Sequence, residues 1–328
     1  MNFSVTKSFR ALVATAPFLV FRVLVYLSVV VLYLLGVGVG GSIGYFLTLG
    51  AEEPGSGVGI GGVTGFVLSG AVIYWLRETL LYAVKAGHIA VLVKWFDGES
   101  LPAGQGQITY ARDQVTQRFG QASILFLLDK LIKGVLKAFN RTVMALSTLI
   151  PIPGLQGLVS IAGKVIETSL TFVDELILAY CMRVESENPW QDSRAALILY
   201  AQNYKIMLKS AVVLTVIAYI FTLVIFLLVL GPFGLLVANF EAVAGFWGFT
   251  LAVIFAWALK AALIEPFMIA CMMQSYFAAI ENQEPEPEWE RKLEAASDKF
   301  SSFADKAKNY VRPASSSTDS NANANETG

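Results

Sequence analysis

The residues best placed to do chemistry are charged side chains inside apolar stretches. Lys260 and Glu265 lie within the apolar run 246–273, and Asp174 and Glu175 lie within a second apolar segment. An ionisable group is costly to hold in a membrane, so each is a candidate for substrate binding or ion coupling. Lys260 and Glu265 point roughly 140° apart on a helix. Each therefore needs a partner on another helix, and structural ion pairing is the alternative role for both pairs.

A second group of charges forms a basic stripe on a helix predicted over about 121–149. Lys130, Lys133, Lys137 and Arg141 recur at helical spacing beside an apolar face. Each charge would cost about 2.5 to 3.5 kcal/mol at the centre of a bilayer, so this segment should not cross exposed to lipid. We predict that it lies in the interface and that these four residues bind anionic headgroups.

The sequence contains no constellation typical of an enzyme or a metal site. His88 is the single histidine, and Cys181 and Cys271 lie in apolar stretches without metal-ligand spacing. We therefore predict no catalytic residue, no metal and no cofactor. Aromatic residues such as Trp257 are candidates for a cage around a quaternary ammonium, with an interfacial belt as the alternative.

Composition places all these residues in a membrane protein. Of the 328 residues, 55% are hydrophobic and only 15% are charged, whereas soluble chains carry about 25% charged residues. The net charge of -1 gives no basic excess for nucleic acid. We therefore predict membrane lipid, and not nucleic acid, as a partner.

Four segments are long and apolar enough to cross the hydrocarbon core, which takes about 20 residues. They are residues 23–50, 55–76, 210–230 and 246–273. Glycine-rich runs in the first two predict a closely packed helical hairpin, because small residues let membrane helices approach each other.

The distribution of basic residues predicts the topology. The turn with Glu52 and Glu53 and the segment with Glu241 carry no Lys or Arg, whereas the remaining connections are rich in them. Basic loops stay in the cytoplasm, so both termini should be cytoplasmic, in the plasma (inner) membrane. Two further crossings in the amphipathic middle would leave this topology unchanged, so four and six crossings both remain open.

These features predict an all-α polytopic membrane protein with amphipathic interfacial helices and a cytoplasmic C-terminal helix. The predicted units are a cytoplasmic N-terminus (1–22), a transmembrane hairpin (23–76), an amphipathic region with a first repeat copy (77–190), a second copy with two transmembrane helices (191–280), a tail helix (281–312) and a disordered end (313–328).

An internal repeat is predicted at an offset of 90 residues. The segment VDELILAYCM at 173–182 lies over LIEPFMIACM at 263–272 without a gap, and Tyr110 and Ala111 lie over Tyr200 and Ala201. Internal repeats are common in transporters. At this offset Glu175 corresponds to Glu265.

Two short motifs resemble the choline-transporter-like family of multi-pass membrane proteins. The stretch LYAQNY at 199–204 is similar to an I-Y-G-K-N-F-like stretch of that family, and FVDELIL at 172–178 is similar to its V-D-x-L-F-L-like run. The resemblance implies transport of a small organic, choline-like cation and makes Tyr200 and Asn203 candidate site residues.

Two functions are compatible with the sequence. The first is a transporter or permease for a small organic solute. The second is a non-catalytic membrane-organising or scaffold protein that binds anionic lipid or a partner protein. Either protein can form homo-oligomers.

Overall fold

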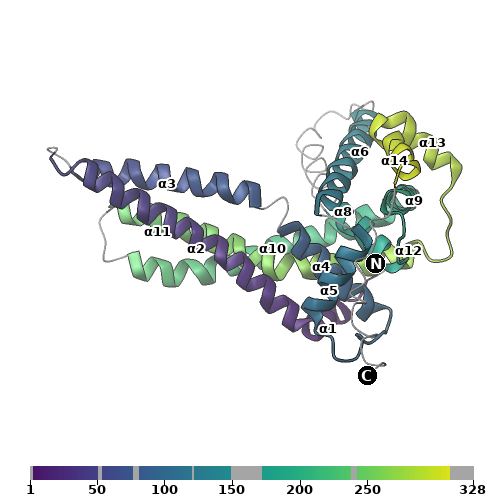
Figure 1. The fold of residues 1–328 in the computed structure, drawn as a ribbon, viewed down its shortest axis with the longest axis horizontal. Helices are drawn as coiled ribbons and strands as arrows, with labels where there is room; N and C mark the ends of the chain where they lie inside the picture. Colours follow the sequence, from purple (N-terminus) through teal and green to yellow (C-terminus); the bar gives the residue numbers. More distant parts are fainter. Residues whose placement is uncertain are drawn as a thin grey trace, which may run out of the picture.

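The computed structural model describes residues 3–50, 54–76, 81–119, 122–148, 172–237 and 242–310. Every regular element in these ranges is a helix. Figure 1 shows a long arm that extends from a compact helical head. The predicted all-α class is therefore confirmed.

Four helices build the arm. They are α2 (Ala16–Leu47), α3 (Pro54–Leu76), α10 (Tyr204–Val237) and α11 (Ala242–Leu259). Within the described residues, four stretches are long and apolar enough to span a membrane: Ala16–Leu47, Gly55–Tyr74, Tyr204–Pro232 and Ala252–Ala279. They overlap the four predicted crossings. The chain is therefore a multi-span membrane protein by the length and composition of its helices.

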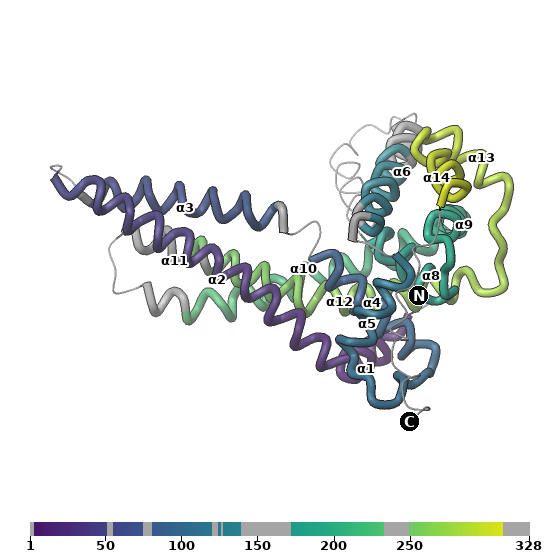
Figure 2. The backbone as a smooth tube through the Cα atoms, viewed as in Figure 1, coloured from purple at the N-terminus to yellow at the C-terminus, as the bar shows by residue number. Residues whose placement is uncertain are grey.

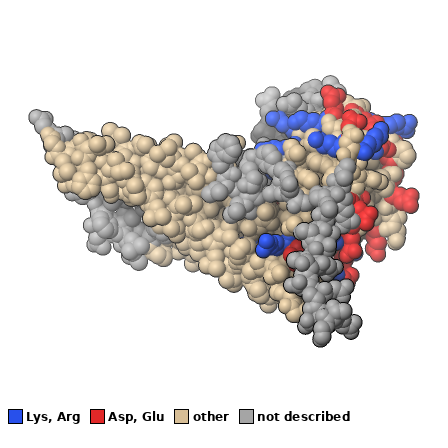
Figure 3. Space-filling model, viewed as in Figure 1, with Lys and Arg blue, Asp and Glu red and all other residues tan. Residues whose placement is uncertain are grey.

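The surface of the arm suits a lipid environment. Its outward side chains are large and apolar, and Leu228, for example, is 69% exposed. Figure 3 shows that the described charged residues on this face gather on the head, whereas the arm carries almost none. Exposed apolar surface on this scale is stable in lipid and would favour aggregation in water.

The α2–α3 hairpin packs through its glycines, as predicted. A Cβ atom added at Gly36 would lie 2.7 Å from the carbonyl oxygen of Gly65, and one added at Gly61 would overlap the carbonyl oxygen of Gly40. Only glycine allows the two backbones to approach this closely.

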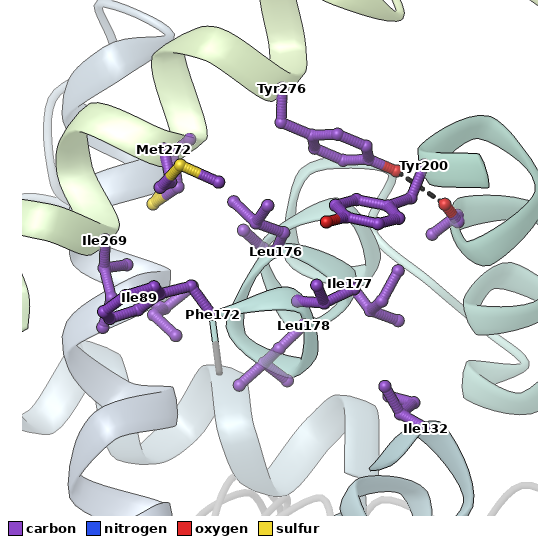
Figure 4. Packing of buried hydrophobic residues seen from close by; sticks show 14 of the residues in the cluster. Ile89, Ile132, Phe172, Leu176, Ile177, Leu178, Tyr200, Ile269, Met272 and Tyr276 are labelled. Carbon is purple, nitrogen blue, oxygen red and sulfur yellow. Dashed lines mark hydrogen bonds between the residues drawn. The ribbon is translucent and has the colours of Figure 1, made fainter. Parts of the chain in front are cut away.

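Three helices form the centre of the head: α4 (Tyr82–Phe96), α8 (Val173–Arg183) and α12 (Glu265–Ala279). Their buried apolar side chains pack against one another, as Figure 4 shows for Ile89, Leu176, Ile269 and Met272. The hydroxyl of Tyr276 donates a hydrogen bond to the carbonyl oxygen of Ala196, 2.9 Å away. This bond satisfies the one polar group of a ring that is otherwise fully buried.

The helix α12 continues the membrane helix α11 through a π-helical turn, η2 (Lys260–Ile264). The backbone N–H of Glu265 donates to the carbonyl of Lys260, five residues earlier. Pro266 follows directly, and proline lacks an N–H for a regular helical bond. The widened turn lets the helix continue past the proline from the arm into the head.

The amphipathic middle of the chain packs against protein, where the sequence predicted the bilayer interface. The helices α5 (Gln107–Phe119) and α6 (Ala122–Thr148) belong to the head. The apolar face of α6, including Leu128, Ile132 and Val135, is buried in the core of the head. An apolar helical face can be covered by protein or by lipid, and periodicity alone does not distinguish these. Residues 149–171 of the predicted amphipathic region (77–190) lie outside the described residues.

The remaining helices complete the head. The N-terminal α1 (Val5–Ala14) packs on the bundle, and α9 (Pro189–Gln202) follows α8. The predicted single tail helix is two helices, α13 (Pro287–Ala296) and α14 (Asp298–Lys308), because Ser297 adopts an extended conformation between them. Leu293, Phe300 and Phe303 are buried, so the tail is docked on the head.

Candidate functional site

An ion-paired cluster lies where the arm joins the head. Lys85 of α4 places its Nζ 3.2 Å from Glu175 Oε1 of α8 and 3.4 Å from Glu265 Oε2 of α12. The three residues are spaced equally along the chain, since Lys85 precedes Glu175 by 90 residues and Glu265 follows by another 90. One lysine thus holds together the three central helices of the head.

Helix geometry explains why one of the two carboxylates lies at this end. Glu175 is in the first turn of α8, and the N-terminus of a helix carries partial positive charge, which stabilises a carboxylate there. Glu265 is the first residue of α12, which continues from η2 without a free N-terminus. The side chain of Glu175 is only 3% exposed, whereas that of Glu265 is 20% exposed. Lys85 therefore compensates one deeply buried carboxylate and one at the edge.

Arg22 brings the first membrane helix into the same cluster. It is fully buried in α2, and its Nη2 donates to the carbonyl oxygen of Ala261 in η2, 2.9 Å away. Its guanidinium also lies 5.7 Å from the ring centre of Tyr26. Two cations, Arg22 and Lys85, thus balance Glu175 and Glu265.

The electrostatics of the pairs outside the membrane spans follow from burial and charge. Burial by itself lowers the pKa of Lys85, but Glu265 and Glu175 outweigh it and raise the pKa. Burial raises the pKa of Glu175, yet Lys85 opposes this and keeps that pKa below its ordinary value. Burial, reinforced by Glu175, raises the pKa of Asp174 well above its ordinary value. Glu175 is therefore the charged partner of Lys85, and Asp174 is the carboxyl that most readily keeps a proton.

The cluster continues towards the surface of the head through Lys133. Lys133 Nζ lies 2.5 Å from Asp129 Oδ1 and 3.5 Å from Asp174 Oδ2. Its side chain is 55% exposed. Lys133 therefore belongs to the basic stripe and to the ion-paired cluster at once, whereas Lys130 and Lys137 are exposed on α6 and the side chain of Arg141 lies outside the described part.

The structure brings together only some of the predicted site residues. Glu265, Glu175 and Asp174 converge, whereas Lys260 is half-buried in η2 and has no carboxylate partner among the described residues. Trp257 packs edge-on against Tyr26, with ring centres 6.1 Å apart. Sequence reasoning missed the roles of Lys85 and Arg22. A further step of 90 residues back from Glu175 would have reached Lys85.

The motif residues Tyr200 and Asn203 lie in the head, away from the cluster. Tyr200 is buried in the core of the head. Asn203 caps α9 and donates from Nδ2 to Leu199 O at 3.0 Å and to Gln283 Oε1 at 2.8 Å. Its contacts fasten the segment between α12 and α13 to the head.

His88 occupies a separate, buried position. Its ring stacks on Phe18 with centres 5.0 Å apart, and its Nε2 lies 3.0 Å from the hydroxyl of Thr15. Burial, helped by the charge of Arg22, lowers its pKa well below the ordinary value. The described residues contain no group of three or more side chains that could hold a metal ion.

No family model matches the chain, and no curated protein or solved structure matches it either. The fold and the site therefore define only the class of the protein, which is a multi-span helical membrane protein with an ion-paired helical head. Its resemblance to the choline-transporter-like family stays a prediction.

Proposed function

We propose that the chain is a membrane-organising protein, in which four spans anchor a helical head that binds anionic lipid at the membrane surface. The observation that carries the proposal is the separation of an apolar arm from a head that holds the charged side chains (Figure 3). A membrane anchor needs only an apolar surface that is stable in lipid. The charged head can then bind anionic lipid at the membrane surface.

The construction of the arm favours an anchor over a transport pathway. In the most apolar stretches of the first three spans, only 22% to 28% of the residues are buried inside the protein. A groove of about 560 Å³ between α2 and α3 is lined mainly by glycine and apolar side chains, with the hydroxyls of Thr48, Thr64 and Ser69. The hydroxyl of Ser69 in this groove is hydrogen-bonded to the carbonyl of Leu32. The groove thus offers few polar groups to a hydrophilic solute.

The position of α6 supports lipid binding by the basic stripe. Lys133 reaches Asp174, which lies at the same end of the central bundle as Glu265, where α12 leaves the membrane helix. The exposed Lys130 and Lys137 lie on the same helix one turn to either side. An anionic leaflet attracts such residues by about 1 kcal/mol each.

Replacing Lys130 and Lys137 with glutamine should weaken association with anionic lipid. Losing about 1 kcal/mol per lysine predicts a reduction of roughly thirtyfold for the pair. Spin-labelled phosphatidylserine, measured against spin-labelled phosphatidylcholine in proteoliposomes, reports the relative association constant. The matched control is Lys292→Gln with Lys308→Gln, on the tail helices farther from the arm in Figure 1. Equal association for the two double variants would contradict the proposal.

We propose that the head faces the cytoplasm, as the distribution of basic residues predicts. A cysteine at Ser56, in the α2–α3 hairpin, should react with an impermeant reagent from outside intact cells. A cysteine at Ser301, exposed on α14, should react only after permeabilisation. The reverse pattern would place the head outside.

Transport of a small organic solute is the second candidate, and the buried cluster favours it. Glu175 Oε2 and Arg22 Nε are buried at the base of the membrane helices, and neither has a hydrogen-bond partner among the residues that the structure describes. Unpaired polar atoms of this kind are costly and are characteristic of sites that take up an ion or a polar ligand.

The variant Glu265→Gln tests this candidate. It removes one carboxylate but leaves Lys85 paired with the more deeply buried Glu175. For a transporter, flux in proteoliposomes should fall at least tenfold across a panel of cationic and zwitterionic solutes, while the melting temperature changes little. Glu288→Gln, on the exposed α13, is the control. Unchanged flux in Glu265→Gln, or no flux in the unmodified protein, would end the transport candidate.

A further inference from the structure

A polar cleft lies at the end of the central bundle opposite the ion-paired cluster. Its volume is about 510 Å³, and it is lined by the last residues of α4, α8 and α12 together with Lys7 of α1. Small-molecule sites commonly have volumes of about 300 to 1,000 Å³. The three helices therefore meet twice, at Lys85 where they begin and at this cleft where they end.

The length of the bundle separates the cleft from the ion-paired cluster. The helix α8 has 11 residues and α12 has 15, so they extend for roughly 16 to 22 Å at 1.5 Å per residue. The arm joins the bundle at the other end, through η2. The cleft lies beside the end of the candidate span Ala252–Ala279.

Aromatic rings from all three helices line the cleft. Phe96 comes from α4, Tyr180 from α8 and Phe277 from α12. Cations of the protein already lie over two of them, with Lys7 Nζ 5.5 Å from the ring centre of Phe96 and the guanidinium of Arg183 4.4 Å from that of Phe277. No cation from the described part of the chain lies over the ring of Tyr180.

The charges of the cleft leave one cation and one anion available. Arg183 is neutralised by Asp97, with Nη2 and Oδ1 2.9 Å apart. Lys7 and Glu281 are both exposed, and within the described residues neither is paired with an opposite charge. The ends of three helices add partial negative charge from their last carbonyls, which favours a ligand cation on the side of Glu281.

The helix α1 is fixed in place beside the cleft. Gln274 of α12 accepts a hydrogen bond from the backbone N–H of Ser4 at 3.2 Å and donates to the hydroxyl of Ser8 at 2.5 Å. These bonds hold Lys7 at the rim, so its position does not depend on a flexible terminus.

We infer that this cleft binds a small zwitterion with an aromatic or apolar body, of the size of an amino acid. The carboxylate of the ligand pairs with Lys7, its ammonium pairs with Glu281, and its body packs against Tyr180. This site is independent of the membrane-organising function proposed above.

L-phenylalanine is the probe, and phenethylamine and 3-phenylpropionate are the comparison ligands because each lacks one of its two charges. Isothermal titration of the full-length protein in detergent should show binding of L-phenylalanine. Each comparison ligand should bind at least tenfold more weakly, since one of its charged partners is missing. No binding of L-phenylalanine, or equal binding of the three ligands, would overturn the inference.

Two variants assign the charges within the site. Lys7→Gln should weaken the binding of L-phenylalanine at least fivefold. It should leave the binding of phenethylamine unchanged, because phenethylamine has no carboxylate to pair with Lys7. Glu281→Gln should weaken the binding of L-phenylalanine and leave the binding of 3-phenylpropionate unchanged, because 3-phenylpropionate has no ammonium group. Arg10→Gln, exposed on the same helix as Lys7, is the matched control and should change none of the three. Equal effects of Lys7→Gln on all three ligands would refute the assignment.

Discussion

Replacing Lys85 with methionine is expected to lower the free energy of unfolding by about 3 to 5 kcal/mol, the cost of leaving a buried charge without its partner. Glu175, whose side chain is only 3% exposed, would lose the cation that compensates it. Glu265, 3.4 Å from the same Nζ, would lose its partner as well. The midpoint of unfolding in SDS, followed by tryptophan fluorescence, measures the change.

Lys94→Met is the matched control, because Lys94 lies on the same helix and its side chain has the same 24% exposure. Its partner Glu99 is 57% exposed, so this pair should contribute at most about 1 kcal/mol. Adding Glu175→Gln to Lys85→Met should restore more than half of the loss, since the orphaned charge is then removed. If Lys85→Met were as mild as Lys94→Met, the cluster would not be what holds the three helices together.

The membrane arm could be predicted from the sequence because the bilayer imposes a simple rule on length and composition. The four predicted crossings overlap the four apolar helices, and the glycine pattern correctly predicted the close α2–α3 hairpin. These are local properties of the sequence. No knowledge of distant contacts was needed to derive them.

The head was harder to predict because its helices bury their apolar faces against one another. The face of α6 with Leu128 and Ile132 reads the same whether lipid or protein covers it. The segments of α4 and α8 were predicted only as part of the amphipathic region 77–190, yet they form the buried centre of the head. Which surface covers an amphipathic helix depends on contacts between distant segments, which periodicity does not report.

The candidate site could be predicted in part. The sequence singled out Glu175 and Glu265, and the structure places both against Lys85. Arg22 interrupts an apolar run, yet its partner Ala261 lies 239 residues away and binds through its backbone. A backbone acceptor carries no signal in the sequence. Lys85 was missed because its carboxylate partners lie 90 and 180 residues further along the chain.

Undocking of the tail is the second change for which we expect a large effect, in this case on local stability. Phe303 of α14 is fully buried, and its ring lies 6.2 Å from that of Trp190 in α9. Phe300 is also fully buried, with its ring 6.4 Å from that of Phe303. Arg194 of α9 adds ion pairs to Glu290 and Glu294 of α13. These contacts fasten the tail to the head, and hydrogen bonds with Gln202 and Asn203 hold the segment 281–286 as well.

Phe303→Ala should therefore release the tail while the rest of the protein stays folded. Truncating a buried Phe to Ala costs about 3 to 5 kcal/mol, which is enough to undock two helices of 10 and 11 residues. Hydrogen exchange over 287–308 should accelerate by at least a hundredfold, and exchange in α4, α8 and α12 should stay as it was. Phe9→Ala, at a side chain that is 61% exposed on α1, is the control and should change neither region. Faster exchange throughout the head would mean that the tail is an integral part of its core, because loss of an independently docked segment leaves the central bundle and its ion pairs in place.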